Sequence, residues 1–399
     1  MKLPDGWKII KLNDVAVPLK RRNTIGNRNV LTSSAQFGLI NQMEYHNRSM
    51  AGEDLSSYYL LYNGDFAYNR SSAKEYPFGA IRRLDKYDTG IVSSLYIPFT
   101  LKKDSCFSDF LAYVLDSELI NQYLYQVCQE GARNHGLLNI AKEDFFQMPL
   151  YLPICQNEQR RIAEFLGTWD EAIEKLEQLI AAKEKRLNWI RFYVLTGRIR
   201  LDKYSKRWEL QRLSNILHEH GTKSSGHEVV HSVSVHKGVV NQIEHLGRNF
   251  SAKDTSNYNL AKSGDIIYTK SPTGDFPYGI IKMNQNKYNV IVSPLYGVFT
   301  PDYPELGIWL DCYFEAPENT NNYLHPIIQK GAKNTINITN KTFLSNSLFL
   351  PTERAEAQAI CRIISVVKTE LKLLQQELTA LKKQKRGLMQ KLLTGTWRV

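Results

Sequence analysis

Three segments in the first half of the chain carry side chains that can hydrogen-bond to phosphate groups and to base edges. They are KRRNTIGNR at residues 20–28, YNRSSAKEY at 68–76 and GARNHG at 131–136. Arg, Lys, Asn and Ser supply donors and acceptors that fit these groups, and the glycines let the backbone come close. The candidate residues are Lys20, Arg21, Arg22, Arg28, Asn69, Arg70, Ser71, Lys74, Arg133, Asn134 and His135.

The second half of the chain carries a matching set at corresponding positions. Its members are Lys223, Thr269, Lys270, Ser271, Lys333, Asn334 and Thr335. Positive charge that is kept in both halves, as at Arg70 and Lys270, suits phosphate binding. Residues that differ, such as His135 and Thr335, are better suited to base selection. For any single position, an ordinary solvated loop residue is an equally good interpretation.

Patterns that would support catalysis or metal binding are weak. GTKSSGH at 221–227 has the glycine spacing of a phosphate-binding loop but carries His where that loop needs Lys. The histidines at 218, 220, 227, 231 and 236 have no cysteine at zinc-finger spacing. Neither a Gly-x-Ser-x-Gly elbow nor the Asn/Asp-Pro-Pro-aromatic tetrapeptide of amino-methyltransferases occurs. We therefore expect no catalytic residues and no metal site, although a nuclease built from dispersed carboxylates stays open.

The composition is that of a folded protein with a basic surplus. The 399 residues leave room for two domains, and 51 Lys and Arg against 40 Asp and Glu give a net charge of +11. That surplus makes a polyanion a plausible partner. Five scattered cysteines favour reduced thiols in the cytoplasm over a disulfide framework. No apolar run is long enough to span a membrane, and the first residues do not form a signal peptide.

The chain repeats itself at an offset of about two hundred residues. GLINQMEYHNRS at residue 38 returns as GVVNQIEHLGRN at 238, and IVSSLYIPFT at 91 returns as IVSPLYGVFT at 291. Each copy is rich in Tyr, Ile, Val and Phe and is broken by turn signals such as Asn-Gly-Asp and Ser-Gly-Asp, a pattern that predicts short strands joined by loops. In the first copy we also expect a helix over 110–127.

A long amphipathic helix is predicted after each copy, because apolar residues follow alternating spacings of four and three. The first seam is Ile162, Leu166, Trp169, Ile173, Leu176, Ile180, Leu187, Ile190 and Val194. The second is Ile360, Ile364, Val367, Leu371, Leu374, Leu378, Leu381, Leu388 and Leu392. Lys183 and Lys385 interrupt the seams and would help to fix the register. Equal length favours pairing of the two helices, against the alternative that each packs on its own domain. Gly197 and Gly395 suit the position just after a helix.

These features predict an α+β protein with a pseudo-twofold internal repeat. The expected domains are a globular unit at 1–152, a long helix at 153–200, a second globular unit at 201–350 and a second long helix at 351–399. Helices of about forty residues extend for about 60 Å. An antiparallel coiled coil of that length would separate the two globular units like the jaws of a calliper.

The whole chain resembles the specificity subunit of type I restriction-modification systems. LPDGWKIIKLNDV at residue 3 is similar to the usual start of a target-recognition domain in that family. The passage into the first helix resembles the family hallmark, with Pro153, Glu158 and Gln159 in place, and LLTG near the end is another shared feature. The second copy departs from the hallmark at Ala357, which replaces the glutamine.

The resemblance implies a non-catalytic protein that binds a split target in double-stranded DNA. It also implies two methyltransferase (modification) subunits and additional restriction subunits as partners. S-adenosylmethionine, ATP and Mg²⁺ would belong to those partners, so no cofactor is expected in this chain. The alternatives are a specificity module of another restriction type or of a methylation-only complex, and a coiled-coil scaffold whose domains bind protein.

Overall fold

The computed structural model describes residues 3–34, 38–47, 52–72, 76–130, 136–246, 254–330 and 336–399. The chain forms two compact units. Unit 1 comprises residues 1–176 and 377–399, and unit 2 comprises residues 177–376. Each unit therefore contains one globular part together with portions of both long helices, and the division runs through the helices.

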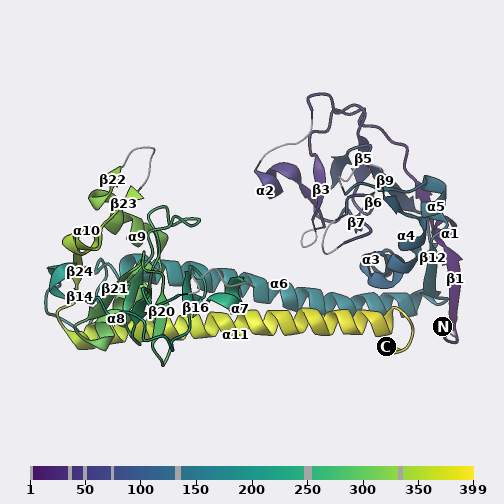
Figure 1. Ribbon diagram of the computed structural model, residues 1–399. Coiled ribbons are helices and arrows are strands. Elements are labelled where there is room, and N and C mark those ends of the chain that lie inside the picture. Colours follow the sequence, from purple (N-terminus) through teal and green to yellow (C-terminus); the bar gives the residue numbers. More distant parts are fainter. Residues whose placement is uncertain are drawn as a thin grey trace. The chain divides into compact units, whose positions relative to one another are not determined.

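The globular part of unit 1 combines short antiparallel strands with short helices (Figure 1). The strands are β1 (Trp7–Lys11), β2 (Ala16–Pro18), β3 (Leu31–Ser34), β4 (Gly38–Asn41), β5 (Tyr59–Tyr62), β6 (Phe66–Asn69), β7 (Ala80–Arg83), β8 (Thr89–Val92), β9 (Tyr96–Leu101), β10 (Gln129–Glu130), β11 (Leu138–Asn139) and β12 (Pro149–Pro153). The helices are α1 (Leu12–Val15), α2 (Gln42–His46), α3 (Ser108–Asp116), α4 (Asn121–Val127) and α5 (Lys142–Phe146). One sheet has the order β2-β9-β6-β7, and the other pairs are β1-β12, β3-β4, β5-β8 and β10-β11.

The globular part of unit 2 has the same topology. Its strands are β13 (Glu209–Arg212), β14 (Leu217–Glu219), β15 (His231–Ser234), β16 (Gly238–Asn241), β17 (Asn259–Ala261), β18 (Ile266–Tyr268), β19 (Ile281–Met283), β20 (Val290–Val292), β21 (Gly297–Pro301), β22 (Gln329–Lys330), β23 (Ile336–Asn337) and β24 (Ser347–Leu350). Its helices are α7 (Gln242–Leu246), α8 (Pro304–Phe314), α9 (Pro317–Leu324) and α10 (Asn340–Ser345). The sheet β14-β21-β18-β19 and the pairs β13-β24, β15-β16, β17-β20 and β22-β23 reproduce unit 1 strand by strand.

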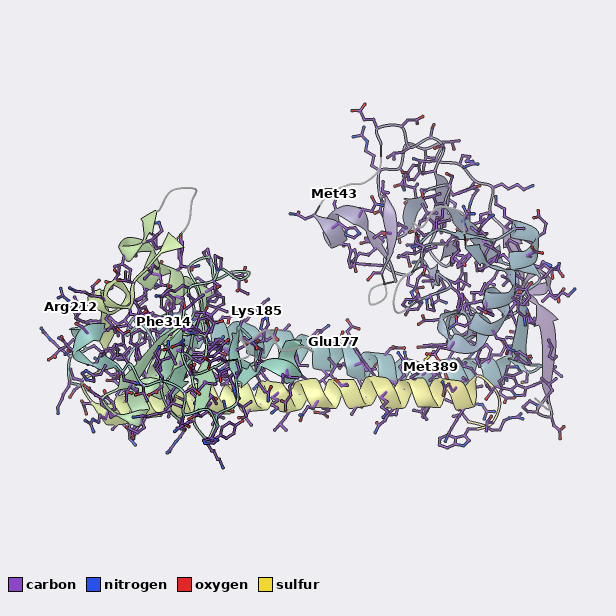
Figure 2. All side chains as sticks on the ribbon, viewed as in Figure 1. Met43, Glu177, Lys185, Arg212, Phe314 and Met389 are labelled. Atoms are coloured by element: carbon purple, nitrogen blue, oxygen red, sulfur yellow. The ribbon has the colours of Figure 1, made fainter. Side chains whose placement is uncertain are left out.

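The two cores also use the same aromatic packing. In unit 1, Tyr68 stacks on Phe145 with ring centroids 4.9 Å apart, and Tyr268 stacks on Phe343 at 4.7 Å in unit 2. Phe314 of α8 is fully buried beside this second cluster (Figure 2). The predicted internal repeat is confirmed in topology and in core chemistry.

The prediction of one continuous helix over 110–127 is wrong. The segment forms α3 and α4 instead, with a 3-10 turn at Glu118–Ile120 between them. Ser117 is extended, with φ −82° and ψ 162°, and its hydroxyl accepts a hydrogen bond from the Leu119 backbone N–H. Serine competes for backbone hydrogen bonds in this way, which favours helix ends over helix interiors. The apolar pattern continues across the break because both short helices face the same core.

The two long helices, α6 (Gln156–Tyr193) and α11 (Arg354–Leu392), pack antiparallel (Figure 1). In unit 1, Ile162 shares the core with Leu392, and further along α6 Asp170 forms an ion pair with Lys385. In unit 2, Lys183 lies 2.6 Å from a carboxylate oxygen of Glu370. Residue numbers rise along one helix as they fall along the other, which confirms the predicted pairing.

The burial of the predicted seam residues differs from that of their neighbours. None of its residues is exposed, whereas neighbouring positions on the outer faces of both helices are. Lys183 and Lys385, which interrupt the seam, each reach a carboxylate on the facing helix, Glu370 and Asp170 respectively. At these two positions, the lysines therefore stabilise the pairing of the long helices by charge, whereas leucine would stabilise it by burial alone.

Both long helices are followed within four residues by a glycine that lies against a tryptophan. Gly197 has φ +69° and Gly395 has φ +68°, a conformation that glycine adopts without strain. A Cβ atom would lie 2.8 Å from the Trp208 ring at Gly197 and 2.8 Å from the Trp7 ring at Gly395. The repeated Leu-Thr-Gly therefore ends each helix and covers the tryptophan that opens a globular part.

An arginine after each glycine binds a buried glutamate at the start of the other long helix. Arg398 Nε lies 2.6 Å from Glu158 Oε1, and Arg200 Nε lies 2.7 Å from Glu356 Oε1. The Trp208 indole N–H also donates to Glu356 at 2.9 Å. Glu158 belongs to the hallmark noted in the sequence, and its equivalent Glu356 makes the same contact. Each pair joins the tail of one long helix to the start of the other.

Candidate nucleic-acid interface

The segment with Asn69, Arg70 and Ser71 is the start of the loop that joins β6 to β7. The base of this loop is closed by Tyr68, whose hydroxyl donates to the Phe78 carbonyl at 2.7 Å. Gly79 has φ +77°, and a Cβ atom there would lie 2.3 Å from the Asn69 carbonyl oxygen. The buried tyrosine and the glycine together hold the loop in place on the sheet. Unit 2 repeats both features at Tyr268 and Gly279.

Two of the three predicted segments meet at this loop. Ser71 forms an antiparallel bridge with Leu137, and the Leu138 N–H donates to the Arg70 carbonyl at 2.8 Å. Arg70 also donates from Nε to the Leu95 carbonyl at 2.7 Å, which orients its guanidinium group. Residues 69–72 and 136–138 thus form one loop cluster, although their sequence separation is more than sixty residues.

The corresponding candidates in unit 2 differ in accessibility. Thr269 is buried, and its hydroxyl accepts a hydrogen bond from the Ile280 N–H at 3.1 Å. The side chain therefore supports the sheet and is not exposed for the DNA contact that the sequence predicts. Lys270 is half-buried, and burial lowers its pKa against a smaller opposing effect of Glu219. Ser271 is exposed.

Arg21, Arg22 and Lys223 are engaged within their own units. Arg21 forms an ion pair with the buried Asp65, and Arg22 donates to the Ser57 carbonyl. At the same place in unit 2, Lys223 donates to the Asn257 carbonyl at 3.2 Å. In both units, these cations hold the loop that carries them (residues 20–28 in unit 1) against the neighbouring strand. Part of their charge is therefore used for contacts within the fold.

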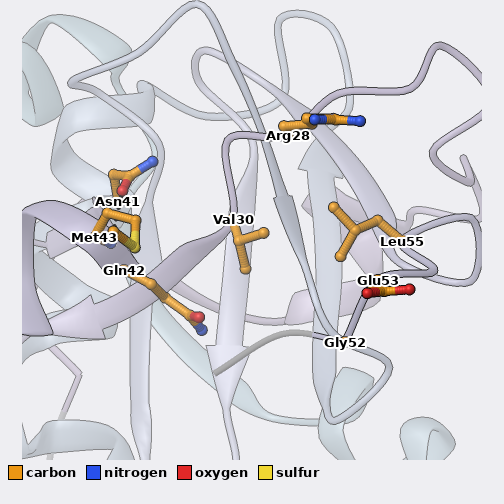
Figure 3. Close-up of a pocket in the computed structure, with 8 residues that line it drawn as sticks. All are labelled: Arg28, Val30, Asn41, Gln42, Met43, Gly52, Glu53 and Leu55. Atoms are coloured by element: carbon orange, nitrogen blue, oxygen red, sulfur yellow. Dashed lines mark hydrogen bonds between the residues drawn. The ribbon is translucent and has the colours of Figure 1, made fainter. Parts of the chain in front are cut away.

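Lys20 and Arg28 are exposed, and neither side chain has a hydrogen bond or ion pair among the described residues. Arg28 borders a hollow of about 490 Å³ in unit 1 (Figure 3). The other lining residues are Val30, Asn41, Gln42, Met43, Gly52, Glu53 and Leu55. Met43 projects from α2 with half of its surface exposed (Figure 2). Sequence reasoning missed this surface, although the Asn-Gln dipeptide repeated at 41–42 and 241–242 was a signal.

Strand register places Glu228 of unit 2 at the position of Arg28, because Leu31 and His231 pair with Asn41 and Asn241. The Glu228 carboxylate accepts hydrogen bonds from the hydroxyls of Ser225 at 2.7 Å and Ser224 at 3.0 Å. These bonds lower its pKa to about 2, the Ser225 hydroxyl contributing most. The two units therefore differ in charge at one matched surface position.

The remaining candidates lie outside the described residues. They are Lys74, Arg133, Asn134, His135, Lys333, Asn334 and Thr335.

Two of the histidines considered as metal ligands, His218 and His231, have other partners. His218 lies 2.6 Å from Asp302, and His231 Nδ1 lies 2.9 Å from the Val229 carbonyl oxygen. In the described part of the chain, no three His, Cys, Asp or Glu side chains group as metal ligands would. Within the same residues, no helix is long and apolar enough to cross a membrane.

A comparison with protein families finds a similarity in the first half of the chain. Residues 4–184 match the model of the type I restriction modification DNA specificity domain. The matched region includes unit 1 loops 20–28 and 69–72 and most of α6. A comparison with curated protein sequences gives no match.

Solved structures of specificity subunits share the fold of the whole chain. The HsdS subunit from Thermoanaerobacter tengcongensis is 16% identical, with 100% of this chain and 99% of that chain covered and a TM-score of 0.51. The S subunit of a type I restriction-modification system from M. genitalium is 13% identical over 98% of each chain, with a TM-score of 0.54. A chain from a study of complex assembly and conformational transition in a type I R-M system is 14% identical. The comparison covers 98% of this chain and 99% of that chain, with a TM-score of 0.61. The specificity-domain fold therefore extends through both units.

Proposed function

We propose that this protein is the DNA-binding specificity subunit of a type I restriction-modification complex and that it recognises a split target. The observation that carries the proposal is that residues 4–184 match a DNA specificity domain whose topology unit 2 repeats strand by strand. Two such domains in one chain suit two half-sites, one for each unit. The net charge of +11 supports binding to a polyanion.

The proposed DNA-contacting surface in unit 1 is the loop cluster at 69–72 and 136–138 together with Lys20 and Arg28. In unit 2 it comprises Lys270 and Ser271. The cations of this surface would position the phosphates, and exposed residues that differ between units would select bases. Lys74, 133–135 and 333–335 remain candidates from the sequence. Arg21, Arg22 and Lys223 would act mainly by holding the first loop.

The chain itself would be non-catalytic. Methyltransferase subunits, and restriction subunits where they exist, would supply the chemistry after this protein has located the target. S-adenosylmethionine, ATP and Mg²⁺ would bind to those subunits. Because the proposed target is chromosomal DNA, the complex would act in the cytoplasm.

The decisive experiment is long-read sequencing of methylated adenines in the host genome with and without this gene. Loss of methylation at one split motif on deletion, and its return on complementation, is the expected result. If every methylated motif persists after deletion, the protein does not direct methylation in the host.

A protein-binding scaffold is distinguished from a DNA reader by the effect of salt on duplex binding. Each phosphate neutralised by Lys or Arg releases counterions, so the affinity of a DNA reader falls steeply as salt rises. A scaffold would bind duplex DNA weakly at all salt concentrations.

A further inference from the structure

Two asparagines, one on each side of Arg28, fix the loop that carries this arginine at the hollow of unit 1. Asn27 donates from Nδ2 to the Thr89 hydroxyl at 2.8 Å, and its side-chain oxygen accepts the Asn29 N–H at 2.7 Å. Asn29 donates from Nδ2 to the Thr89 carbonyl at 2.8 Å. Both sequence neighbours of Arg28 are therefore tied to one residue at the start of β8.

The same hydrogen bonds extend to another wall of the hollow. Asn41 donates from Nδ2 to Asn29 Oδ1 at 2.8 Å. Its own side-chain oxygen accepts the backbone N–H groups of Met43 at 2.7 Å and Glu44 at 3.3 Å and so caps α2. One network thus positions the segments of Arg28 and Met43, which line the hollow from different parts of the chain (Figure 3). A site that is fixed before binding loses less entropy when a ligand arrives.

Three kinds of side chain face this hollow. Arg28 supplies a cation and Glu53 a carboxylate, and both are exposed. Within the described part of the chain, neither of them has a side-chain hydrogen bond or ion pair. Val30, Met43 and Leu55 add an apolar wall. Opposite charges that border one hollow without pairing suit a ligand that offers acceptors to the guanidinium group and a donor to the carboxylate.

The edges of base pairs in the major groove of DNA offer this combination. Guanine presents O6 and N7 as acceptors, and its partner cytosine presents an N4 amino group as a donor. The one apolar group among these edges is the C5 methyl group of thymine. A phosphate fits the hollow less well, because the Glu53 carboxylate would repel it.

We propose that the hollow reads a G·C pair that adjoins a thymine in the half-site of unit 1. The Arg28 guanidinium donates to guanine O6 and N7, and the Glu53 carboxylate accepts from cytosine N4. The apolar wall contacts the methyl group of the neighbouring thymine. This inference rests on the proposed function, since it names the bases that one part of the proposed DNA-binding surface selects.

Unit 2 presents different chemistry at the matched place. Glu228 stands at the position of Arg28, and its carboxylate accepts from two serine hydroxyls at 2.7 and 3.0 Å. Thr255 stands at the position of Leu55, one residue after an aspartate whose Oδ1 accepts a serine N–H at 2.9 Å in both units. The guanine contact and part of the apolar wall are therefore expected in one half-site and not in the other.

The test removes single groups from the DNA and leaves the protein unchanged. The probe is a labelled duplex that carries the split motif found by methylation sequencing, and fluorescence anisotropy measures its affinity for the full-length protein. Replacement of each thymine in turn by uracil removes only the C5 methyl group. We expect one such replacement, beside a G·C pair in one half-site, to weaken binding about fourfold. Replacement of that guanine by 7-deazaguanine, which lacks the N7 acceptor, should weaken binding about tenfold or more.

Two variants assign these effects to the hollow. Arg28→Ala should bind the guanine and 7-deazaguanine duplexes equally, and Met43→Ser combined with Leu55→Thr should bind the thymine and uracil duplexes equally. Ile25→Ser is the matched control and should keep both differences, because Ile25 is 62% exposed on the same loop and lies outside the lining of the hollow. Thermal unfolding shows whether the double variant is folded. If it is not, Met43→Ser alone takes its place and should reduce the difference between thymine and uracil.

Three results would overturn the inference. They are a split motif in which no G·C pair adjoins a thymine, equal affinity for thymine and uracil duplexes at every position, and a difference that persists unchanged in its own variant. Failure of the proposed function looks different, because no duplex would then bind with an affinity that falls as salt rises.

Discussion

At the scale of single residues, Arg28 and Glu228 show how two units with one topology can present different surfaces. Arg28 is exposed beside a hollow and has no side-chain partner among the described residues, whereas Glu228 is held by two serine hydroxyls. A free guanidinium group can donate two hydrogen bonds to guanine, and such a pair discriminates against the wrong base by about 1–3 kcal/mol.

We therefore expect Arg28→Ala to relax base preference at one position of one half-site and to leave the other half-site unchanged. Sequencing of methylated motifs in a strain with the variant gene measures this directly. Glu228→Ala is the matched control and should leave the first half-site unchanged. An identical motif in the Arg28→Ala strain would remove Arg28 from the recognition surface.

Lys270 provides a prediction about pH, because burial lowers its pKa below the ordinary lysine value. As pH rises, a lysine with a lowered pKa loses its proton earlier than a free lysine does, and with it the attraction to phosphate. Duplex affinity should therefore begin to fall at a lower pH than the one at which a free lysine loses its proton. Lys270→Arg stays charged as the pH rises and should flatten the profile. Equal slopes for the two proteins in a fluorescence-anisotropy titration would show that Lys270 does not contact phosphate.

Composition and repetition were enough to predict which loops are basic, but not which of their side chains are free. Arg21 pairs with Asp65, and Thr269 faces the sheet interior. Both facts depend on residues distant in sequence, and a local pattern does not contain them. The hollow beside Arg28 was missed for the same reason, since three separate segments form its wall.

At the scale of elements, the long helices were predictable because a heptad pattern over about nine turns leaves few other solutions. The break between α3 and α4 was not, because an apolar pattern continues across it while a single serine changes the backbone. The arginine–glutamate pairs were also invisible in the sequence. Glu356 and Arg200 are more than 150 residues apart and meet only when the helices pack antiparallel.

Removal of one member of such a pair should destabilise unit 2. Arg200→Ala leaves the Glu356 carboxylate buried with only the Trp208 N–H as a side-chain partner, and a broken buried pair costs about 3–5 kcal/mol. We expect a lower midpoint in thermal unfolding, by about 2–4 °C per kcal/mol for a unit of this size.

Two further variants control for this effect. Arg398→Ala should cost less, because the Arg398 side chain is half exposed and its pair with Glu158 is better solvated. Arg200→Met combined with Glu356→Leu should recover much of the loss, since no charge is left buried. A midpoint for Arg200→Ala equal to that of the unaltered protein would show that the pair does not stabilise the unit.

At the scale of the whole molecule, the internal repeat explains why Leu-Thr-Gly occurs twice in the chain. Each occurrence ends a long helix and covers the tryptophan of a globular part, so the end of the chain completes unit 1 as residues 194–200 complete unit 2. Two copies of one fold in one polypeptide give two globular units that differ in detail.

The last prediction concerns the distance between half-sites. We predict that the paired helices keep the two units at a fixed separation. Both half-sites must then present their grooves on the same side of the duplex. The same side of DNA recurs once per helical turn, about every 10 bp, so the spacer length is restricted. Each added base pair rotates one half-site by about a tenth of a turn, so insertion of one or two should weaken binding sharply. Insertion of five base pairs should abolish the specific component, and mutation of one half-site alone provides the reference for binding by a single unit. Affinity that is independent of spacer length in a gel-shift series would mean that the units bind without a fixed separation, and the calliper model would then be wrong.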